Sequence, residues 1–164
     1  MSNNGTLQQK LGRYSSLQLF FLAFLRMVIG WHFLYEGYVK LTSSSWSAAG
    51  YMHTAPGPFA KIFDTLASTP WIINSIDIFM KYGLTLVGLA LMLGIFTRLA
   101  SVGAAALLLL FYFSNPPWFN VISMPGEGSY LIVNKNLVEF AAVMVLLVFP
   151  SGLAMGFDRL FIKE

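Results

Sequence analysis

Long apolar runs separated by short polar breaks dominate the chain. The first run extends from about residue 17 to 41, and the second from about 72 to 96. A third, from about 99 to 115, follows after only Thr97 and Arg98, so these two runs are expected to be antiparallel neighbours. A helix of about twenty apolar residues crosses the hydrocarbon core of a bilayer. The pattern therefore predicts an all-α integral membrane protein.

The fourth apolar segment is shorter and less uniform. Its uninterrupted part covers only residues 137–149, which is too short to cross a bilayer. Extending the segment toward the N-terminus gives sufficient length but takes in Lys135 and Glu139. We expect a span at about 130–150, which completes a four-helix transmembrane bundle formed by a single domain over residues 1–164.

The segment between the first two runs, residues 42–71, is long for a loop in a helical bundle. Four of its apolar residues recur at the spacing i, i+3, i+4 and i+7 of an amphipathic helix. These are Phe59, Ile62, Phe63 and Leu66. Short amphipathic helices at the membrane interface are therefore expected here. Aromatic residues near the predicted outer boundaries are expected to be interfacial anchors; they are Trp46, Tyr51, Trp71 and Trp118.

Composition agrees with a membrane protein, because 57% of the residues are hydrophobic and only 10% are charged. An ordinary soluble domain carries about a quarter charged residues. The net charge of +3 comes from so few groups that it indicates orientation in the membrane rather than nucleic-acid binding. With four spans, the basic residues divide into Lys10, Arg13, Arg98, Arg159 and Lys163 on one side and Lys40, Lys61 and Lys135 on the other. The positive-inside rule then predicts a multi-pass protein with both termini in the cytoplasm.

The chain contains no cysteine, which excludes disulfides, thiolate metal sites and dithiol chemistry. A haem held by two histidines would need both inside the bundle, whereas His32 lies in a predicted span and His53 lies in the outer loop. We therefore expect no haem and no metal site.

Ionisable residues inside predicted spans are costly unless paired, and each one is a candidate for a functional site. Arg26 lies near the middle of the first span, about 15 Å along the helix axis from Glu36, so the two cannot touch. Arg26 needs a partner on another helix, and Asp77 and Glu139 are the candidates. Two glycines on the first span would permit close approach of a neighbouring helix; they are Gly30 and Gly37.

A second row on the first span consists of His32, Glu36 and Lys40, spaced four residues apart. Glu36 preceding Lys40 is the favourable order for an ion pair within a helix. Glu139 lies at a similar depth, so we expect it to approach Glu36 or Lys40. These charges form either a buried lattice that fixes helix register or a polar ligand pocket, and the two interpretations are compatible. For His32 we expect a hydrogen-bonded histidine at a helix interface, although a quinone carbonyl would also accept a hydrogen bond from it.

Five segments carry a resemblance that covers nearly the whole chain. They are LRMVIGWHFLYEGYVKL at 25–41, GYMHTAPGPFAKIF at 50–63, YGLTLVGLALMLGIFTRLAS at 82–101, GSYLIVNKNLVEF at 128–140 and GFDRL at 156–160. In these segments the chain resembles the DoxX family, close to its DoxD-like branch.

The resemblance implies a small four-helix subunit of the bacterial inner membrane, associated with respiratory or sulfur-redox complexes such as a thiosulfate:quinone oxidoreductase. It implies a quinone as cofactor. The implied partners are the lipid bilayer and other membrane or redox subunits, and a homo-oligomer is also possible. Residues at recurring family positions are Arg26, Glu36, Gly37, Lys40, Arg98, Asn136 and Glu139.

We therefore expect an oxidoreductase-associated membrane subunit that binds a quinone or similar small apolar redox molecule between its helices, near the outer leaflet. The expected binding residues are Arg26, His32, Glu36, Lys40 and Glu139, and the expected supporting residues are Gly30, Gly37, Asp77, Arg98 and Asn136. The sequence assigns no catalytic residue and leaves open whether the chain is catalytic alone. The alternatives are a non-enzymatic scaffold or assembly factor and a carrier of small solutes or lipids.

Overall fold

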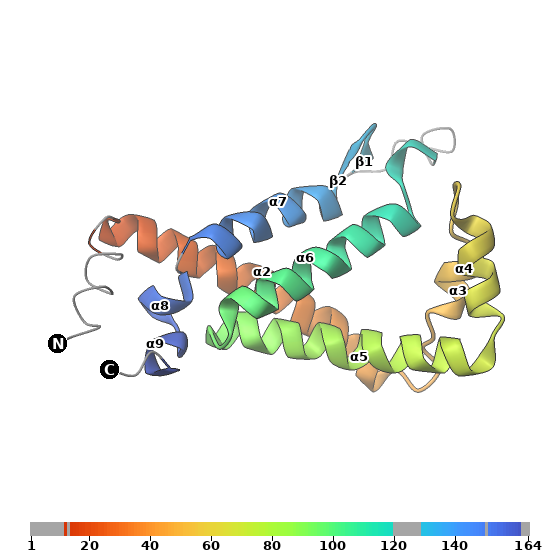
Figure 1. The fold of residues 1–164 in the computed structure, drawn as a ribbon, viewed down its shortest axis with the longest axis horizontal. Helices are drawn as coiled ribbons and strands as arrows, with labels where there is room; N and C mark the ends of the chain where they lie inside the picture. The colour runs from red at the N-terminus through yellow and green to blue at the C-terminus, as the bar shows by residue number, and fades with distance from the viewer. Residues whose placement is uncertain (1–11, 13, 120–128, 150, 162–164) are drawn as a thin grey trace.

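Long apolar helices make up most of the molecule (Figure 1). The computed structural model describes residues 12, 14–119, 129–149 and 151–161. Three helices in this part are long and apolar enough to cross a membrane; they are α2 (Ser16–Thr42), α5 (Pro70–Leu93) and α6 (Thr97–Ser114). A short 3₁₀ turn, η1 (Pro117–Phe119), follows α6. The predicted all-α membrane fold is confirmed.

Local signals in the sequence set the ends of these helices. α2 begins with a capping box, in which the Ser15 hydroxyl accepts the Gln18 N–H at 3.2 Å and the Gln18 side chain accepts the Ser15 N–H at 2.8 Å. α5 ends at Gly94, whose φ of 68° lies in the left-handed region that glycine adopts without strain. Only residues 94–96 separate α5 from α6, which pack as neighbours as predicted.

The start of the predicted fourth span is wrong. Residues 130–134 belong to a small hairpin of β1 (Ser129–Tyr130) and β2 (Val133–Asn134), and helix α7 (Lys135–Val148) begins only after it. The physical reason is the Asn134 side chain, which accepts the Leu137 N–H at 3.0 Å and caps the helix there. The 14 residues of α7 span about 21 Å, less than the hydrocarbon core of about 30 Å. A fourth crossing therefore stays a prediction.

The loop after α2 folds into α3 (Ala49–His53) and α4 (Ala60–Ala67), which lie beyond the start of α5 (Figure 1). α4 is amphipathic as predicted: Phe63 and Leu66 face a small core around Met52, whereas Phe59 and Ile62 are exposed. We call the end of the bundle that carries α3, α4 and the hairpin the outer end. The inner end carries the turn between α5 and α6, with α8 (Ser151–Met155) and α9 (Asp158–Phe161) packed near it.

Glycines bring α2 and α5 into backbone contact. A Cβ added to Gly30 would lie 2.8 Å from the Met92 nitrogen, one added to Gly37 would overlap Thr85, and one added to Gly88 would overlap the Leu34 backbone. The predicted role of Gly30 and Gly37 in close helix approach is confirmed. Between the two ends of the bundle lies an apolar core drawn from α2, α5, α6 and α7, which includes Ile29, Phe33, Leu84, Leu91, Ala104, Leu108, Val143 and Leu146.

Candidate functional site

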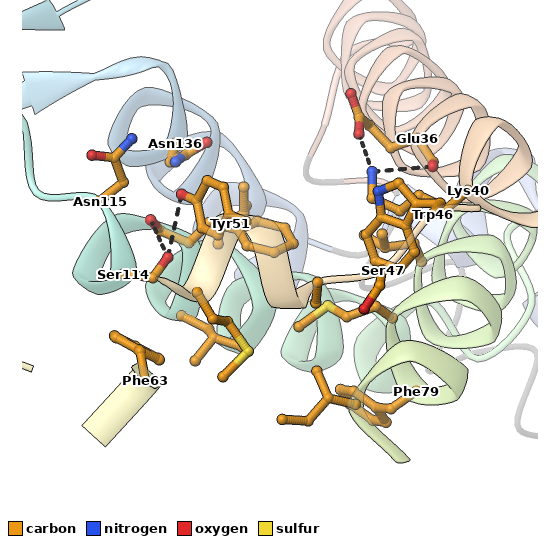
Figure 2. Close-up of a pocket in the computed structure, with 18 of the residues that line it drawn as sticks. Glu36, Lys40, Trp46, Ser47, Tyr51, Phe63, Phe79, Ser114, Asn115 and Asn136 are labelled. Carbon is orange, nitrogen blue, oxygen red and sulfur yellow. Dashed lines mark hydrogen bonds and ion pairs between the residues drawn. The ribbon is translucent and has the colours of Figure 1, made fainter. Parts of the chain in front are cut away.

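A cavity of about 1370 Å³ occupies the outer end of the bundle (Figure 2). Side chains from α2, α5, α6, α7, the hairpin and the outer loop that contains α3 and α4 line it, and most of them are apolar. The lining includes core residues where the cavity meets the apolar interior, namely Phe33, Met80, Leu84 and Leu108. The cavity is therefore built by the bundle and roofed in part by the folded outer loop.

The predicted row on α2 forms one wall of this cavity: His32, Glu36 and Lys40 all line it. The Lys40 ammonium donates to the Glu36 carboxylate and also, at 3.3 Å, to the Glu36 carbonyl oxygen. It lies 5.4 Å from the centre of the Trp46 ring, within range of a cation–π interaction. The predicted Glu36–Lys40 pair is confirmed, and the Lys40 ammonium already has partners within the protein.

His32 pairs with Glu139 across the contact between α2 and α7. Its Nδ1 lies 2.7 and 2.9 Å from the two Glu139 carboxylate oxygens. The predicted hydrogen-bonded histidine at a helix interface is confirmed. The expectation that Glu139 approaches Glu36 or Lys40 is wrong, because the placement of α7 sets Glu139 level with His32, one helical turn nearer the inner end.

A second polar group lies on the other side of the cavity, with Tyr51, Ser114, Asn115 and Asn136 close together in Figure 2. The Ser114 hydroxyl is 3.3 Å from the Tyr51 hydroxyl and donates at 3.1 Å to the Phe111 carbonyl oxygen. Asn136, expected only as a supporting residue, lines the cavity itself. The sequence analysis assigned Tyr51 to the membrane interface and did not single out Ser114.

Trp46 is a further cavity residue that the sequence reasoning assigned to the membrane interface. Two lysines lie near its ring. Besides Lys40 on α2, the Lys81 ammonium on α5 is 5.6 Å from the ring centre. Asp77 explains why the loop returns to the bundle, since its carboxylate accepts the Ala48 N–H at 2.7 Å. The need of an aspartate inside a predicted span for a hydrogen-bond partner was the signal that could have placed this loop against α5.

Arg26 lies at the inner end, away from the cavity, and its side chain is almost completely buried. Its guanidinium donates to the carbonyl oxygens of Ser151 at 3.1 Å and Met155 at 2.6 Å. The candidate partners Asp77 and Glu139 are wrong, because both are engaged elsewhere and the C-terminal segment supplies the acceptors. That Arg26 finds its partners on another helix is confirmed, since both carbonyl oxygens belong to α8.

Arg98 is exposed on the first turn of α6, also at the inner end. Among the residues that the structure describes, no group of three or more His, Asp or Glu side chains is placed to hold a metal ion. The polar groups of the cavity are instead suited to the oxygens of an organic head group: hydroxyls, amides, an imidazole and a paired ammonium surround an apolar space.

Comparison with curated proteins and with solved structures gave no match. The DoxX family model matches residues 21–115, which run from the first turns of α2 to the end of α6 and form more than half of the chain. The matched part includes the His32, Glu36 and Lys40 wall, whereas Glu139 and Asn136 on α7 lie outside it. On this match, the chain belongs to the DoxX family.

Proposed function

We propose that this protein is an oxidoreductase-associated membrane subunit that binds a quinone, or a similar small apolar redox molecule, in the cavity at its outer end. The observation that carries the proposal is a cavity of about 1370 Å³ with an apolar lining and polar groups on two sides. Typical ligand pockets hold roughly 300–1,000 Å³. A space of this size accommodates a head group together with part of an isoprenoid chain.

The chemistry of a quinone matches the distribution of polar groups. Its ring carries two oxygens on opposite edges and is otherwise apolar, so a fitting site offers polar contacts on two sides and aromatic or aliphatic contacts between them. The cavity offers Glu36 and Lys40 on one side and Tyr51 and Asn136 on the other (Figure 2). Figure 2 draws Phe79 below Trp46 and Ser47, and the apolar side chains that line the cavity also include Met52, Phe63 and Met80. Such an arrangement supports a ring held between the two polar groups.

The core below the cavity favours a binding site over a carrier. Leu91, Ala104, Val143 and Leu146 have no exposed surface, and they lie between the cavity and the inner end. A carrier of polar solutes needs a polar path to both sides of the membrane, and this packed apolar layer interrupts such a path within the described residues. The arrangement supports a site that ligands reach from the outer end or from the lipid.

Retention of a quinone separates this proposal from a scaffold. Protein purified in a mild detergent should carry a quinone that mass spectrometry identifies, and added ubiquinone-1 should raise its thermal midpoint, because a ligand that binds only the folded state stabilises it. Glu36→Gln should stay folded but bind ubiquinone-1 about tenfold more weakly, since the Lys40 ammonium loses its charged partner and reorients.

The matched control is Arg98→Gln, which removes an exposed charge at the inner end and should leave quinone binding unchanged. If the wild-type protein retains no quinone and binds none, even when purified with its partner proteins, the proposal is wrong and the scaffold interpretation is favoured.

We also propose that both termini lie in the cytoplasm of a bacterial cell, with the outer end of the bundle outside its inner membrane. The contacts of the C-terminal segment support a fourth crossing: the Phe157 N–H donates to the Leu93 carbonyl and the Asp158 N–H to the Gly94 carbonyl. The chain therefore leaves the hairpin at the outer end and reaches the inner end through α7, with the short helix α8 adding to its length.

Single cysteines test this topology cleanly, because the natural chain has none. Cysteines at Ser44 and Tyr130, both exposed at the outer end, should react with an impermeant maleimide in intact cells. Cysteines at Arg98 and Phe157 should react only after permeabilisation. Labelling of Tyr130 and Phe157 from the same side would show that α7 does not cross the membrane.

A further inference from the structure

The polar groups of the cavity differ in whether the protein already satisfies them. Lys40 and Glu36 bind each other, and the Ser114 hydroxyl binds the Phe111 carbonyl. In contrast, His32 Nε2 and the Asn136 side-chain amide have no hydrogen-bond partner among the described residues, although both side chains line the cavity. Polar atoms left without a protein partner in a largely apolar cavity are the ones expected to bind its occupant.

Glu139 determines which atom of His32 is available. Both of its carboxylate oxygens lie within 3 Å of His32 Nδ1, and its side chain is only 14% exposed, so the ring is held on one edge. A carboxylate accepts hydrogen bonds, so Nδ1 carries a proton in this pair. Nε2 is then the nitrogen left for a ligand. His32 also lines the cavity, and 41% of its side chain remains exposed.

Asn136 lies on α7 one turn from Glu139, toward the outer end. It precedes Glu139 by three residues on α7, and residues three apart on a helix lie on the same face with Cβ atoms about 5–6 Å apart. Since Glu139 touches His32, Asn136 lies one turn of α7 away from this contact, and both His32 and Asn136 line the cavity. An asparagine amide both donates and accepts hydrogen bonds.

We propose that the head group of the occupant binds where α2 meets α7, with His32 Nε2 and the Asn136 amide as its polar contacts and Glu139 as the positioning residue of His32. This inference rests on the proposed function and names the substrate class more closely. A ligand oxygen here meets an amide that donates to a carbonyl and an imidazole nitrogen that accepts from a hydroxyl. The site thus suits a head group whose oxygen alternates between carbonyl and hydroxyl, as in a quinone and its quinol.

The test compares ubiquinone-1 with a hydrocarbon analogue of the same shape that lacks the ring oxygens. Wild-type protein should prefer ubiquinone-1, and His32→Phe and Asn136→Leu should each weaken ubiquinone-1 binding about tenfold while leaving the affinity for the hydrocarbon unchanged. The matched control is Ser75→Ala, a lining residue whose hydroxyl donates at 2.8 Å to the Trp71 carbonyl of its own helix, and it should change neither affinity.

Because His32→Phe leaves the Glu139 carboxylate without its partner, the double variant His32→Phe/Glu139→Leu is measured beside it and should show the same selective loss. Glu139→Gln tests positioning. With ¹³C-carbonyl-labelled ubiquinone-1, the infrared carbonyl band of the bound quinone should lie below its position in hydrocarbon solvent. Glu139→Gln should shift that band while the hydrocarbon affinity stays at the wild-type value.

The outcomes separate two failures. If wild-type protein binds ubiquinone-1 but the His32 and Asn136 variants bind it equally well, the head group lies elsewhere and this inference is wrong, while the proposed function stands. If Glu139→Gln leaves the carbonyl band unchanged, Glu139 has no positioning role. If wild-type protein binds no quinone, the proposed function is wrong and this inference with it.

Discussion

Gly88→Ala is expected to destabilise the bundle strongly, because it adds a methyl group where α2 and α5 are in backbone contact. A Cβ at this position would overlap the backbone of Leu34 and lie 2.8 Å from the Gly30 carbonyl oxygen. Backbone atoms cannot rotate away as a side chain can, so α2 and α5 must move apart along their shared surface. Overpacking a core typically costs about 1–3 kcal/mol, and we expect about 3 kcal/mol or more here.

Gly83→Ala is the matched control on the same helix. The nearest atom to a Cβ at Gly83 is Phe79 Cε2 at 4.0 Å, an ordinary van der Waals contact. Alanine should therefore be tolerated and could add up to about 1 kcal/mol, since glycine is the poorer helix former. The measurement is the unfolding free energy or the thermal midpoint of both variants in detergent. Equal midpoints would show that the α2–α5 contact adjusts more easily than its backbone geometry indicates.

The three long helices could be predicted from hydropathy alone, because length and apolar composition decide which segments cross a bilayer. The fourth could not. The apolar residues Leu131, Ile132 and Val133 extend the hydrophobic run into the hairpin, and hydropathy does not distinguish a strand from a helix there. Asn134 marks the boundary as a helix cap, at the start of a short polar break between this hairpin and the apolar run at 137–149.

The candidate site could also be predicted only in part, because the sequence encodes helix faces but not how the helices are placed against one another. The spacing of His32, Glu36 and Lys40 fixes them on one helical face whatever the tertiary structure, so their common wall followed from the sequence. Their partners depend on how far one helix is displaced along another, which spacing does not encode. That displacement pairs Glu139 with His32. Trp46 joins the site only because the outer loop folds back onto the bundle.

The hydrogen-bond partners of Arg26 could not be predicted from the sequence either. Charge pairing favours a carboxylate partner, and the sequence offered Asp77 and Glu139 at membrane depth. The structure satisfies the guanidinium with main-chain carbonyl oxygens of α8, which every residue possesses and no sequence pattern marks. Glycines make room for it: a Cβ at Gly156 would lie 2.7 Å from the Arg26 Nη1 atom, and one at Gly94 would overlap the guanidinium.

Arg26→Ala is accordingly expected to release the C-terminal segment from the bundle. The change removes both hydrogen bonds from a side chain that is 2% exposed and leaves the carbonyl oxygens of Ser151 and Met155 without their donor. Hydrogen bonds to charged groups contribute about 1.5–3 kcal/mol each, so we expect a loss of about 3–5 kcal/mol. Arg26→Lys keeps the charge but lacks the planar fork that reaches two acceptors, and should recover only part of it.

Hydrogen exchange measures where that loss falls. The amides of Phe157 and Asp158 donate to the carbonyls of Leu93 and Gly94, so in Arg26→Ala they should exchange at least tenfold faster, while amides in the middle of α5 change less. Arg98→Ala removes an exposed arginine at the same end and should keep wild-type exchange, with a stability change within about 0.5 kcal/mol. Wild-type exchange at Phe157 and Asp158 in Arg26→Ala would mean that the main-chain bonds of the C-terminal segment hold it without the arginine.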